Sequence, residues 1–335
     1  MIENLDVAMV WAFIIAFAVF AYVVMDGFDL GIGILFPRLE VGQERDTAMN
    51  SVAPVWDGNE TWLVLGGGGL MAVFPLAYAI VLPALYTPIM VMLLALVFRG
   101  VAFEFRWRDP AHRAAWDFAF SAGSFLAALS QGISLGAMLQ GIKVVGRSYA
   151  GGWWDWLTPF SLLVGISVVV GYGLLGATWL IMRAEGRLQE RAYGFARWLA
   201  VGTVVCVVLV SALTPFLEHD YWRRWFEMPG VLAAAQIPLL VAIVAVLLFR
   251  SLAQRRERSP FLLTLGLFFL CFVGLGVSIF PDIVPGAVSI AEAAAPRSSL
   301  VFVLVGAVVL IPLILAYTGW SYWVFRGKTG HDGYH

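Results

Sequence analysis

Acidic side chains interrupt two strongly apolar parts of the chain. In MDGFDLG, Asp26 and Asp29 are three residues apart, and in VWDGNETW the same spacing separates Asp57 from Glu60. Residues three apart lie on one face of a helix, so each pair would present two carboxylates side by side. Such pairs can share and pass on a proton, or they can hold a cation such as Arg99 in an ion pair.

The composition indicates that these carboxylates belong to a membrane protein. The chain has 335 residues, of which 61% are hydrophobic and 13% are charged, whereas soluble domains carry about 25% charged residues. A net charge of −1 lacks the basic excess typical of nucleic-acid binding, so we expect no nucleic-acid partner. Ionisable groups at membrane depth are costly and therefore indicate a function by default.

The uncharged runs predict an all-α polytopic membrane protein with about nine transmembrane helices in one domain, residues 1–335. A crossing needs about 20 residues, so the run 61–98 is too long for one. Counting two crossings there places 16 of the 21 basic residues on one side, and cytoplasmic loops are the basic ones. The N-terminus is then periplasmic and the C-terminus cytoplasmic. The expected spans are 7–36, 48–72, 77–99, 118–142, 156–182, 198–217, 228–249, 259–281 and 298–325, which divide into two four-helix bundles plus one helix.

This topology places the stretch VWDGNETW inside the second span. Two helices cannot both be drawn from 61–98 with a turn between them, so the second must begin earlier, near residues 47–52. At 1.5 Å per residue, Asp57 would then lie about 10–15 Å along that helix from its cytoplasmic end.

Two interpretations of the acidic residues remain open at this point. In the first, Asp26, Asp29, Asp57 and Glu60 form a proton relay reached from the cytoplasmic side. In the second, they have a structural role in ion pairs that hold helices together, for instance a pair between Asp29 and Arg99. The structural role is favoured for Asp26 and Asp29, and proton handling is favoured for Asp57. The spacing does not distinguish the two roles for Glu60.

The histidines indicate what this chain does not bind. The four are His112, His219, His331 and His335, and all lie outside the apolar runs. A b-type haem buried between membrane helices most often takes imidazole as its axial ligand. We therefore expect no haem and no metal on this chain. No loop is long enough to form a soluble catalytic lobe.

Several motifs together resemble a known family. They are DGFDLGIGIL, WDGNETWLVLGGGGLMAVFPLAYA, GYGLLGATWLIMRAEG, PDIVPGAVSIAEAAAP and LILAYTGWSYWVFRGK, in this order from the first helix to the last. The chain is identified by them as a member of the subunit II family of cytochrome bd-type quinol oxidases. RGVAFEFRWR resembles the cyanide-insensitive branch of that family.

The resemblance implies a subunit of a quinol-oxidising, oxygen-reducing complex of the bacterial inner membrane. The b- and d-type haems would be in a larger partner, subunit I, so this chain would not be catalytic alone. A small single-helix subunit, lipid and a structural quinone are further partners that the resemblance suggests, without assigned residues.

The resemblance also implies roles for two residues. Asp57 matches an aspartate on a proton path toward subunit I, and Trp62 matches a tryptophan that lines an oxygen route. Some members have Gln-Val where this chain has Glu60-Thr61, so Glu60 could extend the relay or only pair with a neighbour.

Two other function classes compete with this interpretation. A proton-coupled secondary transporter would use the same intramembrane carboxylates, but no inverted repeat is apparent. A purely structural scaffold would tolerate Asp57→Asn without loss of turnover.

Overall fold

The structure is a computed structural model that describes residues 6–228 and 230–329. Its first half consists of helices joined by short turns. They are α1 (Val7–Leu35), η2 (Phe36–Arg38), α2 (Gln43–Asn50), α3 (Trp56–Val73), α4 (Pro75–Ala84), α5 (Tyr86–Arg108), η3 (Pro110–His112) and α6 (Arg113–Leu139).

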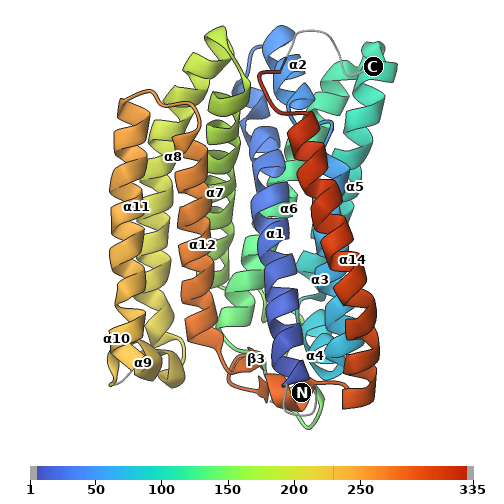
Figure 1. The fold of residues 1–335 in the computed structure, drawn as a ribbon, viewed down its shortest axis with the longest axis vertical. Coiled ribbons are helices and arrows are strands. Elements are labelled where there is room, and N and C mark those ends of the chain that lie inside the picture. Colours follow the sequence, from blue (N-terminus) through green and yellow to red (C-terminus); the bar gives the residue numbers. More distant parts are fainter. Residues whose placement is uncertain (1–5, 229, 330–335) are drawn as a thin grey trace.

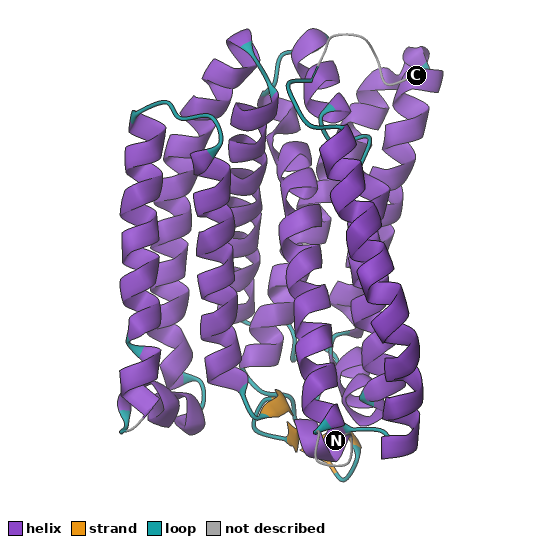
Figure 2. Cartoon of the chain, viewed as in Figure 1, coloured by secondary structure: helices purple, strands orange, loops and turns teal. Residues whose placement is uncertain are grey.

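The second half continues the same pattern after a short hairpin. Its elements are β1 (Val144–Val145), β2 (Ser148–Tyr149), α7 (Pro159–Arg183), α8 (Gly186–Leu213), η4 (Thr214–Phe216), α9 (His219–Phe226), α10 (Gly230–Ala234), α11 (Gln236–Ala253), α12 (Ser259–Ile279), β3 (Asp282–Val284), β4 (Val288–Ser289), α13 (Ile290–Ala293) and α14 (Arg297–Val324). The strands form two antiparallel two-stranded hairpins. Figure 2 shows strand segments in the loops at the end of the bundle where α1 begins.

The protein is an all-α polytopic membrane protein. Within the described residues, eight helical segments are long and apolar enough to cross a membrane. The helix α3 is absent from that group because its polar beginning and its glycines make it less apolar, although it has 18 residues. It leads from the end of the bundle near α2 to the end near α4 (Figure 1). The described residues thus supply eight of the about nine crossings that the sequence predicts, and α3 as the ninth stays a prediction.

The long helices pack side by side in two neighbouring groups (Figure 1). In one group α1 packs against α3 and α6, and α6 packs against α5. In the other, α7 packs against α8 and α12, and α11 packs against α8 and α12. The helix α7 also contacts α1 and α6, which joins the groups, while α14 lies outside against α1 and α3.

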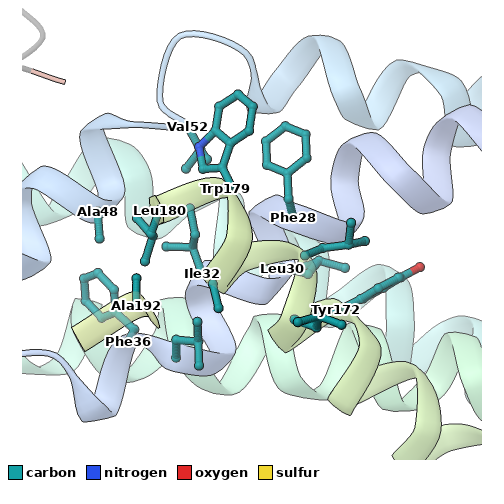
Figure 3. Close-up of a cluster of buried hydrophobic side chains, with 14 of the residues drawn as sticks. Phe28, Leu30, Ile32, Phe36, Ala48, Val52, Tyr172, Trp179, Leu180 and Ala192 are labelled. Carbon is teal, nitrogen blue, oxygen red and sulfur yellow. The ribbon is translucent and has the colours of Figure 1, made fainter. Parts of the chain in front are cut away.

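The main core lies where α1, α2 and α7 meet. Phe28 stacks on Trp179 with ring centroids 4.2 Å apart, and Phe36, Val52 and Leu180 are buried around them (Figure 3). Dispersion among such close-packed side chains holds membrane helices together, because lipid offers no hydrophobic driving force between them. This packing fixes the part of α1 that carries the acidic residues.

Two of the expected spans are broken in the structure. The expectation of one continuous helix from about residue 48 through VWDGNETW is wrong, because α2 ends at Asn50 and α3 begins at Trp56. Pro54 lies in the turn between them, where it has no amide hydrogen to donate and restricts the residue before it. Asp57 is therefore in the first turn of α3 rather than 10–15 Å along a longer helix.

The region around residue 85 differs in the same way. The expected span 77–99 divides into α4 and α5, which are separated at Leu85. Pro83 lies inside α4 and weakens the backbone ladder just before this break. The helix α5 extends to Arg108, which is past the end of the uncharged run 61–98. A membrane helix can continue beyond its apolar part into the membrane–water interface.

Candidate functional site

Arg99 is the centre of a buried charge cluster formed by three helices. Its Nη1 atom lies 2.9 Å from Asp26 Oδ1, and its Nη2 atom lies 3.5 Å from Asp29 Oδ2. Nη1 also contacts Glu60 Oε1 of α3. The side chains of Arg99, Asp26 and Asp29 are all 0–1% exposed, whereas that of Glu60 is 25% exposed. The cluster thus contains three carboxylates and one guanidinium.

Two aromatic rings pack beside the guanidinium. Trp56 of α3 and Phe103 of α5 stack with centroids 4.9 Å apart and planes inclined by 6°. The guanidinium carbon of Arg99 lies 5.9 Å from the Trp56 ring centroid and 5.5 Å from that of Phe103. Contacts of this kind favour a cation electrostatically and shield it from water.

A chain of hydrogen bonds links α14 to Asp29. The Nδ2 atom of Asn59 donates to Asp29 Oδ2 at 2.8 Å and to the Met25 carbonyl oxygen at 3.3 Å. The Oδ1 atom of Asn59 accepts from the Tyr322 hydroxyl at 2.8 Å. The amide in VWDGNETW therefore joins α1, α3 and α14, a role that the sequence did not reveal.

A second chain approaches Asp26 from α6 and α7. The Tyr172 hydroxyl donates to Gln131 Oε1 at 2.7 Å, and Gln131 Nε2 donates to the Tyr22 hydroxyl at 2.7 Å. Tyr22 is one turn before Asp26 on α1, and both carboxylate oxygens of Asp26 are buried without a hydrogen-bond partner among the described residues. Sequence reasoning missed these residues, although a glutamine inside the apolar run 118–142 was a usable signal.

Two charged residues near the cluster in sequence lie outside it. Asp57 is exposed in the first turn of α3, and no side-chain partner for it is present in the described parts of the chain. Glu104 is 60% exposed and pairs with Arg108 at 3.2 Å on the surface of α5. Asp57 is thus adjacent to the buried cluster through Glu60 rather than part of it.

Trp62 lies on the inner side of α3. It is 2% exposed and packs edge-to-face against Phe17, with ring centroids 5.6 Å apart. Ala18 and Ala21 of α1 belong to the same apolar cluster. Its indole Nε1 is buried without a hydrogen-bond partner among the described residues.

A second ion-pair group ties together the ends of α2, α5 and α6. Arg106 donates through Nε to Asp117 at 2.5 Å, and its Nη2 lies 2.9 Å from Asp46. Arg45 also donates to Asp117, at 2.7 Å, and Arg113 pairs with Asp46. The partners come from different helices, which is why the linear sequence gave no sign of this group.

The histidines that the structure describes are at the surface ends of helices. His112 is in η3 with 72% of its side chain exposed, and His219 is the exposed first residue of α9. His331 and His335 lie outside the described residues. Within residues 6–228 and 230–329, no group of three or more His, Cys, Asp or Glu side chains is arranged to hold a metal ion.

Comparison with known proteins decides the family. The sequence profile described as cytochrome bd terminal oxidase subunit II matches residues 7–325. The chain belongs to this family. The cytochrome bd-I ubiquinol oxidase subunit 2 of Escherichia coli (strain K12) is 30% identical over 368 aligned residues, which cover 98% of this chain and 96% of that protein. The cytochrome bd ubiquinol oxidase subunit 2 of Bacillus subtilis (strain 168) is 28% identical over 340 residues, 96% of each chain.

A solved structure has the same fold. In the structure of bd oxidase from Geobacillus thermodenitrificans, one chain matches with a TM-score of 0.77 and 17% sequence identity, covering 96% of this chain and 100% of that chain. This chain is therefore a subunit II of a cytochrome bd quinol oxidase, which is an oxidoreductase complex of the bacterial inner membrane. Family membership implies a subunit I partner that carries the haems. It also assigns the chain to the oxidase rather than to a transporter.

Proposed function

We propose that this subunit II supplies protons from the cytoplasmic side to the haem-bearing subunit I and provides the surface on which subunit I assembles. The observation that supports this most directly is a buried cluster around Arg99 that reaches the surface through Glu60, next to the exposed Asp57. In this proposal the subunit has no catalytic centre of its own, and subunit I carries out quinol oxidation and oxygen reduction.

The distribution of basic residues supports cytoplasmic access to this cluster. Asp57 is in the first turn of α3, at the end of the bundle where α2 lies (Figure 1). Cytoplasmic ends of membrane proteins are enriched in Lys and Arg. The elements at or leading to this end carry Arg38, Arg45, Arg106, Arg108, Arg113, Arg183, Arg187, Arg255 and Arg256.

The steps of proton movement follow from exposure. Asp57, which is exposed, takes up a proton from water at the cytoplasmic side. Glu60 is one helical turn further along α3 and is partly exposed, so it can receive that proton directly or through water. Arg99 supplies the positive charge that makes an ionised carboxylate tolerable at this depth.

Asp57→Asn is the direct test of the proton role. The change keeps the side-chain size and removes the exchangeable proton, so we expect quinol-dependent oxygen consumption to fall by at least about tenfold. The haem content, measured from the reduced-minus-oxidised spectrum of the purified complex, should be unchanged. Glu104→Gln, which removes an exposed carboxylate of α5, should leave both quantities at the parental level.

Two results would contradict this role of Asp57. A parental turnover rate in Asp57→Asn would leave only the scaffold function. A loss of haem content would give Asp57 a structural role in assembly.

The outer face of α3 supports the assembly part of the proposal. Gly58, Gly67 and Gly68 have no atom of the described chain within 4 Å of the position that a Cβ would take. Val64 and Met71 on the same helix are 72% and 57% exposed. Glycine disfavours helix formation by about 1 kcal/mol relative to alanine, and small residues in membrane helices allow close approach of another helix. We infer that a helix of subunit I packs here.

Gly68→Trp tests this surface. A bulky ring would keep the partner helix away, so we expect subunit I to be lost from a mild-detergent purification of tagged subunit II. Gly194→Trp on α8, where a Cβ also meets nothing within 4 Å, is the matched control and should retain subunit I. Retention of subunit I by both variants would place the interface elsewhere.

Trp62 is proposed to line the oxygen route. The apolar cluster that Trp62 forms with Ala18 and Ala21 supports this role, because oxygen is an apolar molecule. The small single-helix subunit, the structural quinone and lipid stay predictions from the family resemblance, and none is assigned to a residue.

A further inference from the structure

A cavity of about 210 Å³ lies between the junction of α4 with α5 and the loop that follows β2. The helix α4 is at the end of the bundle where α1 begins (Figure 1), and β2 packs against it. Pockets for drug-sized ligands have volumes of about 300–1,000 Å³. This cavity therefore fits a small chemical group.

One wall of the cavity is the C-terminal end of α4. The Leu85 amide donates to the Val81 carbonyl oxygen at the end of this helix. The carbonyl oxygens of Pro83 and Ala84, which both line the cavity, accept no hydrogen bond from a backbone amide of the described residues. Pro88, four residues after Ala84, has no amide hydrogen to offer it. Free carbonyls at a helix C-terminus carry partial negative charge and favour a cation.

Aromatic side chains form much of the remaining wall. The rings of Tyr86 and Trp153 have centroids 6.2 Å apart and planes inclined by 49°. Tyr149 and Trp156 also line the cavity. The Tyr149 hydroxyl donates to the Gly152 carbonyl oxygen at 2.7 Å, so the phenol oxygen remains available as an acceptor. Aromatic faces attract cations, and groups of such rings typically recognise substituted ammonium ligands.

The charges around the cavity also favour a cation. Among the described residues that line it, none is charged. Lys143 pairs with Asp155 at 3.3 Å, and Asp155 Oδ1 lies 3.1 Å from the position that a Cβ would take on the lining residue Gly152. An acyl chain or a neutral ring would leave the α4 carbonyls without a donor. A hard inorganic cation would need about six oxygen ligands, which aromatic walls do not provide.

The mouth of the cavity is at the level of the membrane–water interface. Tyr86 and Trp153 are 52% and 64% exposed, as aromatic residues of interfacial belts are. Tyr86 is the first residue of α5, and the apolar part of this crossing follows it directly. Phospholipid headgroups are the abundant polar groups at this depth, so the ammonium that meets the cavity there is part of a lipid.

We propose that this cavity binds the ammonium group of a phosphatidylethanolamine headgroup. The carbonyl oxygens of Pro83 and Ala84 accept its hydrogen bonds, and the ring faces of Tyr86 and Trp153 cover it. The family resemblance suggests lipid as a partner without assigned residues, and this cavity supplies them. The inference goes beyond the proposed function and does not depend on the proton role or on the α3 surface.

Fluorine NMR of the purified two-subunit oxidase, labelled with fluorotryptophan, tests the proposal at the site itself. Trp153→Leu and Trp154→Leu identify the signals of the two neighbours, each by the resonance that it removes. They are 64% and 65% exposed, and of the two Trp153 lines the cavity. We expect a short-chain phosphatidylethanolamine to shift the Trp153 signal saturably and to leave the Trp154 signal in place. An unmoved Trp153 signal would overturn the proposal.

Comparison of ligands identifies the group that is recognised. Phosphatidylglycerol of the same chain length has no ammonium group and should not shift the Trp153 signal. An equal shift by this lipid would overturn the proposal, because the acyl chains or the phosphate would then be what binds. Phosphoethanolamine, which lacks acyl chains to bury, should need a concentration at least about tenfold higher. A shift at the same concentration would make a free amine the ligand and reject the lipid.

Two variants of Tyr86 test the aromatic wall. Tyr86→Leu removes the ring face, so we expect the phosphatidylethanolamine concentration at half-maximal shift to rise about two- to fivefold. Tyr86→Phe keeps the ring and should bind as the parent does. The haem spectrum confirms assembly of each variant, and the exposed position of Tyr86 makes the substitution tolerable. Parental affinity in Tyr86→Leu would contradict recognition by the ring.

Discussion

We expect Arg99→Met to abolish recovery of the assembled oxidase. The guanidinium is the cation that the structure places among Asp26, Asp29 and Glu60, and the substitution leaves these carboxylates without it at a buried site. Removing one partner of a buried ion pair costs about 3–5 kcal/mol, because the remaining charge is uncompensated. The haem content of membranes from cells that express the variant with subunit I measures this loss.

The matched control is Arg108→Met on the same helix. Arg108 is 77% exposed and pairs with Glu104 at the surface, where an ion pair contributes between about 0 and 1 kcal/mol. It should assemble as the parent does. Normal assembly of Arg99→Met would contradict this structural role of Arg99, because the three carboxylates would then tolerate burial without their cation.

We expect Gly31→Ala to force α1 and α7 apart where they pack in the main core. A Cβ on Gly31 would lie 1.9 Å from the Tyr172 carbonyl oxygen and 2.8 Å from the Gly176 backbone nitrogen. Both obstacles are backbone atoms of α7, which cannot move aside as a flexible side chain can. Overpacking costs about 1–3 kcal/mol and occasionally more, so we expect a clear fall in the thermal midpoint of the haem spectrum of the purified complex.

Gly194→Ala is the control for a methyl group added to a helical glycine. A Cβ there meets nothing within 4 Å, and alanine favours the helix by about 1 kcal/mol. We expect an equal or slightly higher midpoint. Equal midpoints for Gly31→Ala and Gly194→Ala would show that α1 and α7 can move apart at little cost, against the close approach in the structure.

Hydrophobic patterning accounts for most of what the sequence predicts correctly. The runs 7–36, 156–182, 259–281 and 298–325 correspond closely to α1, α7, α12 and α14. Each lies between charged or turn-forming residues, and an uncharged run of this length has few alternatives to a helix in a membrane. Helix bounds were harder to predict in runs that contain prolines. Pro54 and Pro83 lie at or beside the breaks that divide two of the expected spans.

The candidate site was predicted only in part. The spacing of Asp26 with Asp29 and of Asp57 with Glu60 indicated acidic helix faces, and Arg99 was an evident partner. Which carboxylates meet Arg99 depends on the rotation of α1 and α3 relative to α5. That rotation buries Asp26 and Asp29, brings Glu60 to Arg99 and leaves Asp57 outside.

By itself, the sequence determined that this is a polytopic membrane protein with acidic groups in its apolar part, because the cost of exposing backbone or burying charge in lipid leaves few other solutions. The tertiary structure alone decided that Tyr22, Gln131 and Tyr172 form one chain toward Asp26, since they come from α1, α6 and α7. It likewise decided that Tyr322 reaches Asn59, 263 residues earlier in the chain. Such contacts follow from helix packing angles and close glycine contacts, which have no local signature in the sequence.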